Sequence, residues 1–184
     1  MKNAYVHFAE GFEEIEAITI VDVLRRAEIP TKMVSVSGKL AVQGAHGITI
    51  HTDQLIEDTD FSDAAIMILP GGQPGANNLN SHDDLKKEIK QFYESGKPVA
   101  AICAAPIVLG GMKILEGKDV VCYPGYEDKL IGANIKHDLA LKTGNIITGR
   151  GPGAALNFAL KIVSELKNSE KADTMAKAMI VETW

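Results

Sequence analysis

The sequence has few of the features that mark a disulfide-stapled, membrane-spanning or nucleic-acid-binding protein. It contains only two cysteines, Cys103 and Cys122, too few for a disulfide framework, and their spacing to the histidines is not that of zinc ligands. Its apolar runs are far shorter than the roughly 20 residues that a membrane-crossing helix needs. The net charge of −5 leaves no basic excess for phosphate. We therefore expect no nucleic acid and no membrane among its partners.

What is present is ordinary for a globular protein, with 46% hydrophobic and 23% charged residues in a chain of 184. A chain of this length can bury one sizeable core, so we expect a single domain over residues 1–184. The first residues enter a strand-like run directly, with no apolar segment that ends in a cleavage site. We therefore expect a cytoplasmic protein.

Short apolar runs alternate with segments of helical periodicity along the chain. Strands are predicted over residues 3–8, 30–36, 40–43, 48–51, 64–69, 98–102, 119–123, 140–142 and 145–148. Helices are predicted over residues 13–27, 81–96 and 170–181, and after the glycines that precede residue 154. Such alternation implies α/β architecture, a doubly wound and mostly parallel sheet with helices on both faces.

The most informative stretch is the apolar run that ends in Cys103. Small residues follow the cysteine, and Pro106 is tolerated in the first turn of a helix. This pattern predicts a sharp strand-to-helix corner, like the nucleophile elbow of hydrolases, where the N–H groups of the helix favour a thiolate. A buried structural cysteine is the alternative, but the small neighbours Ala101, Ala104 and Ala105 leave room around the sulfur.

Two further groups are predicted to lie near the same edge of the sheet. Glu16 follows the first strand, at the carboxyl edge where open α/β folds build their sites, whereas Glu13 and Glu14 are expected only to cap the helix. Gly71 and Gly72 follow the strand over residues 64–69 and let the backbone approach a ligand. Gly72 is therefore a candidate for half of an oxyanion site.

The histidines do not suggest a metal centre. His46 and His51 are expected in exposed turn and edge positions, and a third ligand for an ion cannot be placed from the sequence. We therefore predict no metal site. His46 is a candidate for the mouth of the substrate site together with Arg25 and Arg26, although all three are equally well interpreted as surface charges.

Four motifs together resemble those of the DJ-1/ThiJ/PfpI superfamily, in its order and spacing. They are Gly11-Phe12-Glu13-Glu14-Ile15-Glu16, Leu69-Pro70-Gly71-Gly72 with Gly75-Ala76, Ala100-Ala101-Ile102-Cys103-Ala104-Ala105-Pro106, and Thr148-Gly149-Arg150-Gly151-Pro152-Gly153. The resemblance runs from the first strand to the C-terminal helix. It is greatest to the DJ-1 group, which includes the bacterial YajL-like proteins.

The resemblance implies a flavodoxin-like fold, a homodimer and a reactive cysteine at Cys103 with no cofactor. Glu16 matches the family carboxyl that touches the sulfur, and Gly72 and Ala104 match the positions whose N–H groups face a bound oxyanion. Gly71 and Arg150, from the same motifs, are candidate substrate-binding residues. The activities that the resemblance implies are glyoxalase-type conversion of small carbonyls without glutathione, deglycation of glycated amino groups, and peroxide sensing.

The chain departs from this pattern at Tyr123, which stands where the family's glyoxalases carry histidine. A phenol titrates near pH 10 and an imidazole near 6.5, so a tyrosine hydrogen-bonds a substrate but is a poor general base at neutral pH. Ala104 also stands where the family's peptidases carry histidine, which counts against proteolysis.

Three hypotheses follow from these residues. The first is a thiol-dependent enzyme acting on small carbonyls through Cys103 and Glu16, with Tyr123 as a substrate-binding residue. The second is an oxidative-stress sensor or chaperone-like protein in which Cys103 is oxidised to a sulfinate without turnover. The third, a cysteine hydrolase of the glutaminase type, lacks a histidine partner for the thiol and ranks last.

Overall fold

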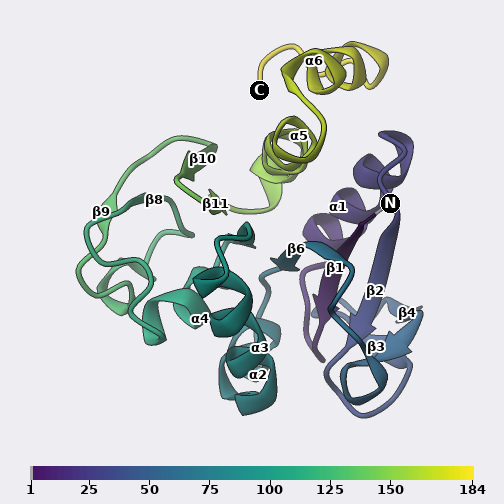
Figure 1. The fold of residues 1–184 in the computed structure, drawn as a ribbon, viewed down its shortest axis with the longest axis vertical. Helices are drawn as coiled ribbons and strands as arrows, with labels where there is room; N and C mark the ends of the chain where they lie inside the picture. Colours follow the sequence, from purple (N-terminus) through teal and green to yellow (C-terminus); the bar gives the residue numbers. More distant parts are fainter. Residues whose placement is uncertain (1) are drawn as a thin grey trace.

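The computed structural model describes residues 2–184 and is built on one seven-stranded sheet (Figure 1). Its strand order is β10-β11-β7-β6-β1-β2-β5, and every neighbouring pair is parallel except the hairpin of β10 and β11. The strands are β1 (Asn3–Phe8), β2 (Thr31–Ser35), β5 (Gln54–Leu55), β6 (Ala64–Leu69), β7 (Val99–Ile102), β10 (Ala140–Thr143) and β11 (Ile146–Gly149). This confirms the predicted doubly wound, flavodoxin-like α/β class.

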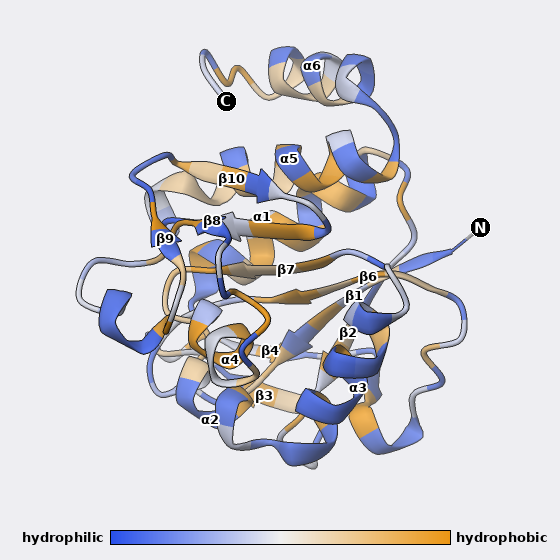
Figure 2. Cartoon of the chain, turned by 60° about the vertical axis from the view of Figure 1, so that its left-hand side comes forward, coloured by the Kyte–Doolittle hydropathy of each residue, from blue (hydrophilic) through white to orange (hydrophobic). Residues whose placement is uncertain are grey.

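Helices cover both faces of this sheet (Figures 1 and 2). One face carries α1 (Glu14–Arg26) and α5 (Ala155–Leu166), with α6 (Ser169–Ala178) packed on α5. The other carries α2 (Gly75–Ser81), α3 (Asp83–Glu94) and α4 (Pro106–Gly111). None of the helices in residues 2–184 has the length and apolarity to cross a bilayer.

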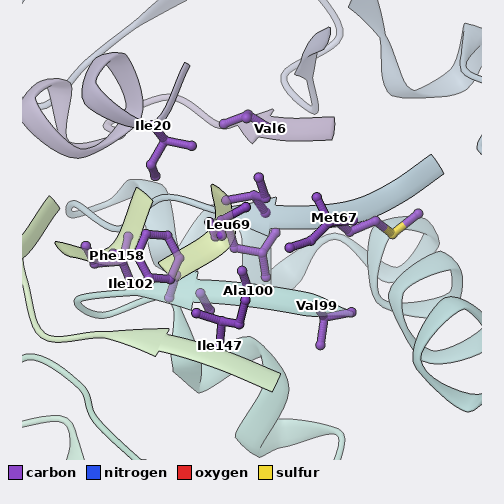
Figure 3. Close-up of a cluster of buried hydrophobic side chains, with 14 of the residues drawn as sticks. Val6, Ile20, Met67, Leu69, Val99, Ala100, Ile102, Ile147 and Phe158 are labelled. Atoms are coloured by element: carbon purple, nitrogen blue, oxygen red, sulfur yellow. The ribbon is translucent and has the colours of Figure 1, made fainter. Parts of the chain in front are cut away.

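The core lies between the sheet and these helices, as the orange interior of Figure 2 shows. Strand β7 is buried along its whole length, which is expected where a parallel strand has helices on both sides. In the cluster drawn in Figure 3, Ile20 of α1 and Phe158 of α5 project toward the strand residues, and both are fully buried. Dense packing of this kind fixes the carboxyl ends of β1, β6 and β7 beside one another.

Two small sheets lie outside the central one. Strands β3 (Ala41–Gln43) and β4 (Thr49–His51), close to the strands predicted over residues 40–43 and 48–51, form an antiparallel hairpin. The predicted strand over residues 119–123 is only β8 (Asp119–Val120), paired with β9 (Asn134–Ile135). The ladder stops there because the next N–H groups donate elsewhere, Val121 to the Thr148 hydroxyl and Tyr123 to the Cys103 carbonyl.

The segment after β6 also differs from the prediction, since Ser81 does not cap the helix over residues 81–96. Ser81 instead ends α2, a short helix that the sequence pattern did not reveal. His82 caps α3: its backbone is extended, and its Nδ1 accepts a hydrogen bond of 3.2 Å from the Leu85 N–H. An imidazole nitrogen thus does the work of the usual side-chain oxygen.

Candidate active site

Cys103 lies at the sharp corner between β7 and α4 that the sequence predicted. Its φ of +65° is in the left-handed region that non-glycine residues rarely adopt. Two backbone bonds hold it there: its N–H donates to the Gly149 carbonyl at 2.9 Å, and its carbonyl accepts from the Tyr123 N–H at 2.8 Å. The side chain is only 7% exposed. A strained, over-determined backbone of this kind is typical of functional sites.

Glu16 reaches the thiol from the first turn of α1. The residue is fully buried, and its Oε2 accepts a hydrogen bond of 2.8 Å from the Gly71 N–H. A β-carbon on Gly71 would lie 2.6 Å from Cys103 Cβ and 2.8 Å from Glu16 Oε2, so only glycine fits between them. The other carboxyl oxygen, Oε1, is buried and has no hydrogen-bond partner among the described residues. Only one of the two carboxyl oxygens thus accepts a hydrogen bond. A buried carboxyl of this kind is suited to hold a proton, because burial disfavours its charged form.

Two backbone N–H groups, those of Gly72 and Ala104, lie close enough to the sulfur of Cys103 to lower the pKa of its thiol. Gly72 has a φ of +91°, and a β-carbon there would come within 2.3 Å of the Glu13 nitrogen. The glycine is therefore required both for the turn after β6 and for its close approach to the start of α1. The site thus places two unshared donors where negative charge on sulfur, or on an oxygen bound to it, would develop.

The protonation of the pair is set mainly by burial. Burial raises the pKa of Glu16 to about 7, and the hydrogen bond from Gly71 opposes this rise. Burial and the Glu16 charge raise the pKa of the Cys103 thiol to about 12, against the lowering by the two N–H groups. Burial of the sulfur and the neighbouring Glu16 carboxylate therefore outweigh the N–H groups that were expected to favour a thiolate. At neutral pH the two side chains together retain at least one proton.

Tyr123 and Arg150 meet beside this site. Both line a cavity of about 290 Å³, together with Pro124, Leu139 and the segment 151–154. Tyr123 is 46% exposed, and its N–H bond to the Cys103 carbonyl places the cavity next to the thiol's own backbone. One Arg150 guanidinium nitrogen donates to the His137 carbonyl at 3.0 Å. The fold thus brings together two of the four candidate substrate-binding residues.

Gly71 and His46 do not line that cavity. The Gly71 N–H is occupied by Glu16, so this residue holds the carboxyl. His46 is exposed in the loop between β3 and β4, as predicted, and its Nδ1 lies 2.8 Å from the Glu14 carboxylate. Arg25 and Arg26 do not reach the mouth within this chain: they end α1 and pair with Asp53 and Asp22.

Glu14 does more than cap α1, which was its only expected role. Its buried carboxylate, in the first turn of α1, also accepts hydrogen bonds from the backbone N–H groups of His46, at 2.7 Å, and Ile48, at 3.4 Å. Burial would raise the pKa of Glu14, but the bonds from His46 and the backbone outweigh it and lower that pKa. The same contacts raise the pKa of His46. The sequence pattern missed this link because it joins residues 32 positions apart.

The fold and the site define a class, a doubly wound α/β protein with a buried cysteine on a nucleophile-elbow corner. Comparison with known protein families narrows this class, because the DJ-1/PfpI family model matches residues 2–165 of the chain. The chain belongs to the DJ-1/PfpI family.

Relatives match along nearly the whole chain. The zebrafish Parkinson disease protein 7 homolog is 37% identical over 185 residues, covering 98% of each chain. The glutathione-independent glyoxalase DJR-1.2 of Caenorhabditis elegans is 34% identical, covering 92% of this chain and 91% of its own. The structure of oxidised Toxoplasma gondii DJ-1 superposes with a TM-score of 0.95 at 32% identity, covering all of both chains. The chain spans 42% of the length of the Arabidopsis thaliana DJ-1 homolog B.

Proposed function

We propose that this protein is a cysteine-dependent enzyme acting on small reactive carbonyls, which converts methylglyoxal to lactate without glutathione. The observation that carries the proposal is the close packing of Glu16 and Cys103 around Gly71, with the Gly72 and Ala104 N–H groups close enough to the sulfur to lower the pKa of its thiol. This arrangement supplies a nucleophile, a proton carrier and an oxyanion site within one buried cluster. A relative named as a glutathione-independent glyoxalase supports the same activity.

The proposed reaction needs no external oxidant or cofactor, because its atoms balance with water alone. Glu16 accepts the thiol proton as the sulfur of Cys103 attacks the aldehyde carbon, and it returns this proton to the aldehyde oxygen, giving a hemithioacetal. The ionised Glu16 then takes the hydrogen of that carbon as a proton and gives it to the neighbouring ketone carbon, while the hydroxyl proton of the hemithioacetal passes to the former ketone oxygen. The product of this transfer is a lactyl thioester, which water hydrolyses to lactate while the thiol is restored. The Gly72 and Ala104 N–H groups stabilise the oxygen anions that form on the way.

Tyr123 and Arg150 are proposed to bind the substrate in the adjoining cavity. The Tyr123 hydroxyl donates a hydrogen bond to a carbonyl oxygen without exchanging its own proton, which limits the rate. Amino groups that methylglyoxal has glycated are a second substrate class, since the adduct keeps the carbon skeleton of methylglyoxal. A second copy of the chain is the partner that we propose.

The test is lactate formation from methylglyoxal by the purified protein. We expect turnover that Cys103→Ala abolishes and that Cys122→Ala leaves unchanged, because Cys122 is buried away from the Glu16 carboxyl. Retained turnover in Cys103→Ala would disprove the mechanism. Absence of turnover in the parent protein would favour the sensor function below.

A peroxide sensor is the second candidate, favoured by the unpartnered Oε1 of Glu16 in the same buried site. A protonated carboxyl at that position would donate a hydrogen bond to a Cys103 sulfinate, and the two N–H groups would bind its oxygens. Mild peroxide should then add two oxygens to Cys103 alone, detected by peptide mass spectrometry. Equal oxidation of Cys122, or oxidation unchanged by Glu16→Gln, would count against this function.

A further inference from the structure

The cavity beside Cys103 is lined by a single charged side chain, that of Arg150. It measures about 290 Å³, and its other lining residues are uncharged: Tyr123, Pro124, Leu139 and the segment 151–154. A guanidinium group stays ionised at every pH at which proteins are folded. We propose that Arg150 makes the site selective for carbonyl substrates that carry a carboxylate. This inference rests on the proposed function and names the substrate class of the same site.

Arg150 differs from the other two arginines of the chain because it has no acidic partner. Arg25 and Arg26 each pair with an aspartate. Within residues 2–184, the Arg150 guanidinium donates one hydrogen bond, to the His137 carbonyl at 3.0 Å, and forms no ion pair. Acidic residues are not scarce, since the chain has 24 of them against 19 lysines and arginines. The guanidinium therefore keeps the rest of its N–H donors for a ligand or for water.

An acidic residue in the segment that holds Arg150 does not neutralise it. Asp138 belongs to the segment 137–139, and the carbonyls of its two neighbours accept hydrogen bonds from the Arg150 side chain and backbone. Asp138 itself lines the neighbouring cavity, together with Lys161. The segment thus fixes the position of the guanidinium and leaves its charge uncompensated. Arg150 is partly buried, so a carboxylate that reaches it is screened less than one in open water.

The backbone attaches this charge to the reacting centre. The Cys103 N–H donates to the Gly149 carbonyl at 2.9 Å, and Arg150 is the next residue of the chain. Tyr123, which lines the same cavity, donates its N–H to the Cys103 carbonyl at 2.8 Å. A substrate that reacts at Cys103 can therefore extend into the cavity and present its far end to the guanidinium.

The cavity has room for a substrate longer than methylglyoxal. Its volume is that of roughly ten water molecules in the liquid, and a three-carbon molecule fills only part of it. Pro124, Leu139 and Pro152 offer apolar surface on which a short hydrocarbon linker can pack. A guanidinium can bind a carboxylate through two parallel N–H···O bonds. The substrate class is therefore an oxoaldehyde with a carboxylate a few carbons from the reacting carbonyl, of which methylglyoxal is a small and uncharged analogue.

The experiment compares 4,5-dioxopentanoate, an oxoaldehyde with a terminal carboxylate, with its neutral methyl ester. In both compounds water is taken up and the oxoaldehyde end becomes a 2-hydroxy carboxylate, as in the proposed reaction of methylglyoxal. We expect the parent protein to convert the carboxylate with a kcat/KM about tenfold or more above that of the ester, the usual effect of a hydrogen bond to a charged group. Arg150→Met should lower kcat/KM for the carboxylate about tenfold and leave that for the ester nearly unchanged.

Two further variants separate the guanidinium from charge in general. Arg150→Lys keeps the positive charge without the planar fork and should retain part of the preference for the carboxylate. Lys161→Met removes one positive charge from the neighbouring cavity and should retain all of it. A preference that survives in Arg150→Met, or equal kcat/KM for the two compounds in the parent, would overturn this inference and leave the proposed function in place.

Failure of the proposed function has a different signature, the absence of turnover of methylglyoxal and of both compounds. Calorimetric binding to Cys103→Ala, which has no thiol to attack the carbonyl, then tests the inference by itself. Tighter binding of the carboxylate than of the ester, lost when Arg150→Met is added, supports the inference. Equal binding of the two compounds overturns it.

Discussion

Glu16 Oε2 and Cys103 Cβ both lie beside Gly71, each within 3 Å of the point that a β-carbon on that glycine would occupy. The carboxyl and the thiol come from elements 87 positions apart in the chain, and a single glycine sets how closely they approach.

Gly71→Ala should reduce turnover about 100-fold while the protein still folds. The added methyl group would meet Cys103 Cβ at 2.6 Å and the Ile102 carbonyl at 2.9 Å, so the thiol and the carboxyl must move apart. A displacement near 1 Å at a reacting pair costs about 100-fold in rate. Gly111→Ala is the matched control, because its β-carbon meets only Asn80 Oδ1, at an ordinary 3.5 Å. The test is to measure the rate of lactate formation by both variants and to verify their folding by circular dichroism. A folded Gly71→Ala variant that is as active as Gly111→Ala would contradict the prediction.

Glu16→Gln should reduce kcat strongly and change KM little. The amide oxygen can still accept the Gly71 hydrogen bond, so the geometry is kept, but the side chain can no longer carry a proton. Loss of a positioned acid–base group costs about 10²–10⁴-fold. Steady-state kinetics with methylglyoxal measure this. A variant as active as the parent would show that the proton travels by another route.

Tyr123→His should raise turnover at neutral pH. An imidazole can exchange a proton at pH 7, and the position is 46% exposed at the edge of the cavity, so the smaller ring fits without repacking. Tyr123→Phe, the control, removes the hydroxyl and should lower turnover below that of the parent. Comparison of kcat/KM for the three proteins tests this, and equal values would mean that the residue does not touch the substrate.

His7 should make the fold sensitive to acid. It is completely buried in β1, its Nε2 has no hydrogen-bond partner among the described residues, and burial lowers its pKa to about 4 from an ordinary 6.5. The unfolded chain therefore takes up the proton first, and stability is lost as the pH falls from about 6.5 to about 4. The loss amounts to about 3 kcal/mol at most.

Urea unfolding of the parent and of His7→Leu, each at pH 7.5 and pH 4.5, measures this contribution. Other titrating groups affect both proteins alike, so the difference between their pH dependences isolates His7. The leucine variant should lose about 2–3 kcal/mol less than the parent between the two values of pH. Identical losses would show that His7 remains neutral in both states or is charged in both.

The sequence by itself determined the position of the thiol and the order of most strands and helices, although not α2 or β5. The apolar run before Cys103 and the small residues after it are local signals, and they correctly predicted the end of β7 and the turn into α4. The motif that carries Glu16 likewise placed a carboxyl at the carboxyl edge of the sheet. Such patterns can be recognised from sequence because the spacing of apolar residues and the conformations open to the backbone depend on residues that are neighbours in the chain.

Only the tertiary structure decided which residues that are distant in the sequence form hydrogen bonds or ion pairs with one another. It joined Glu14 to His46 across 32 positions, ended β8 at Val120 by a bond from Val121 to Thr148, and buried Cys103 deeply enough to raise its pKa. The physical reason is that desolvation and long-range hydrogen bonds depend on what packs around a group, which adjacent residues do not specify.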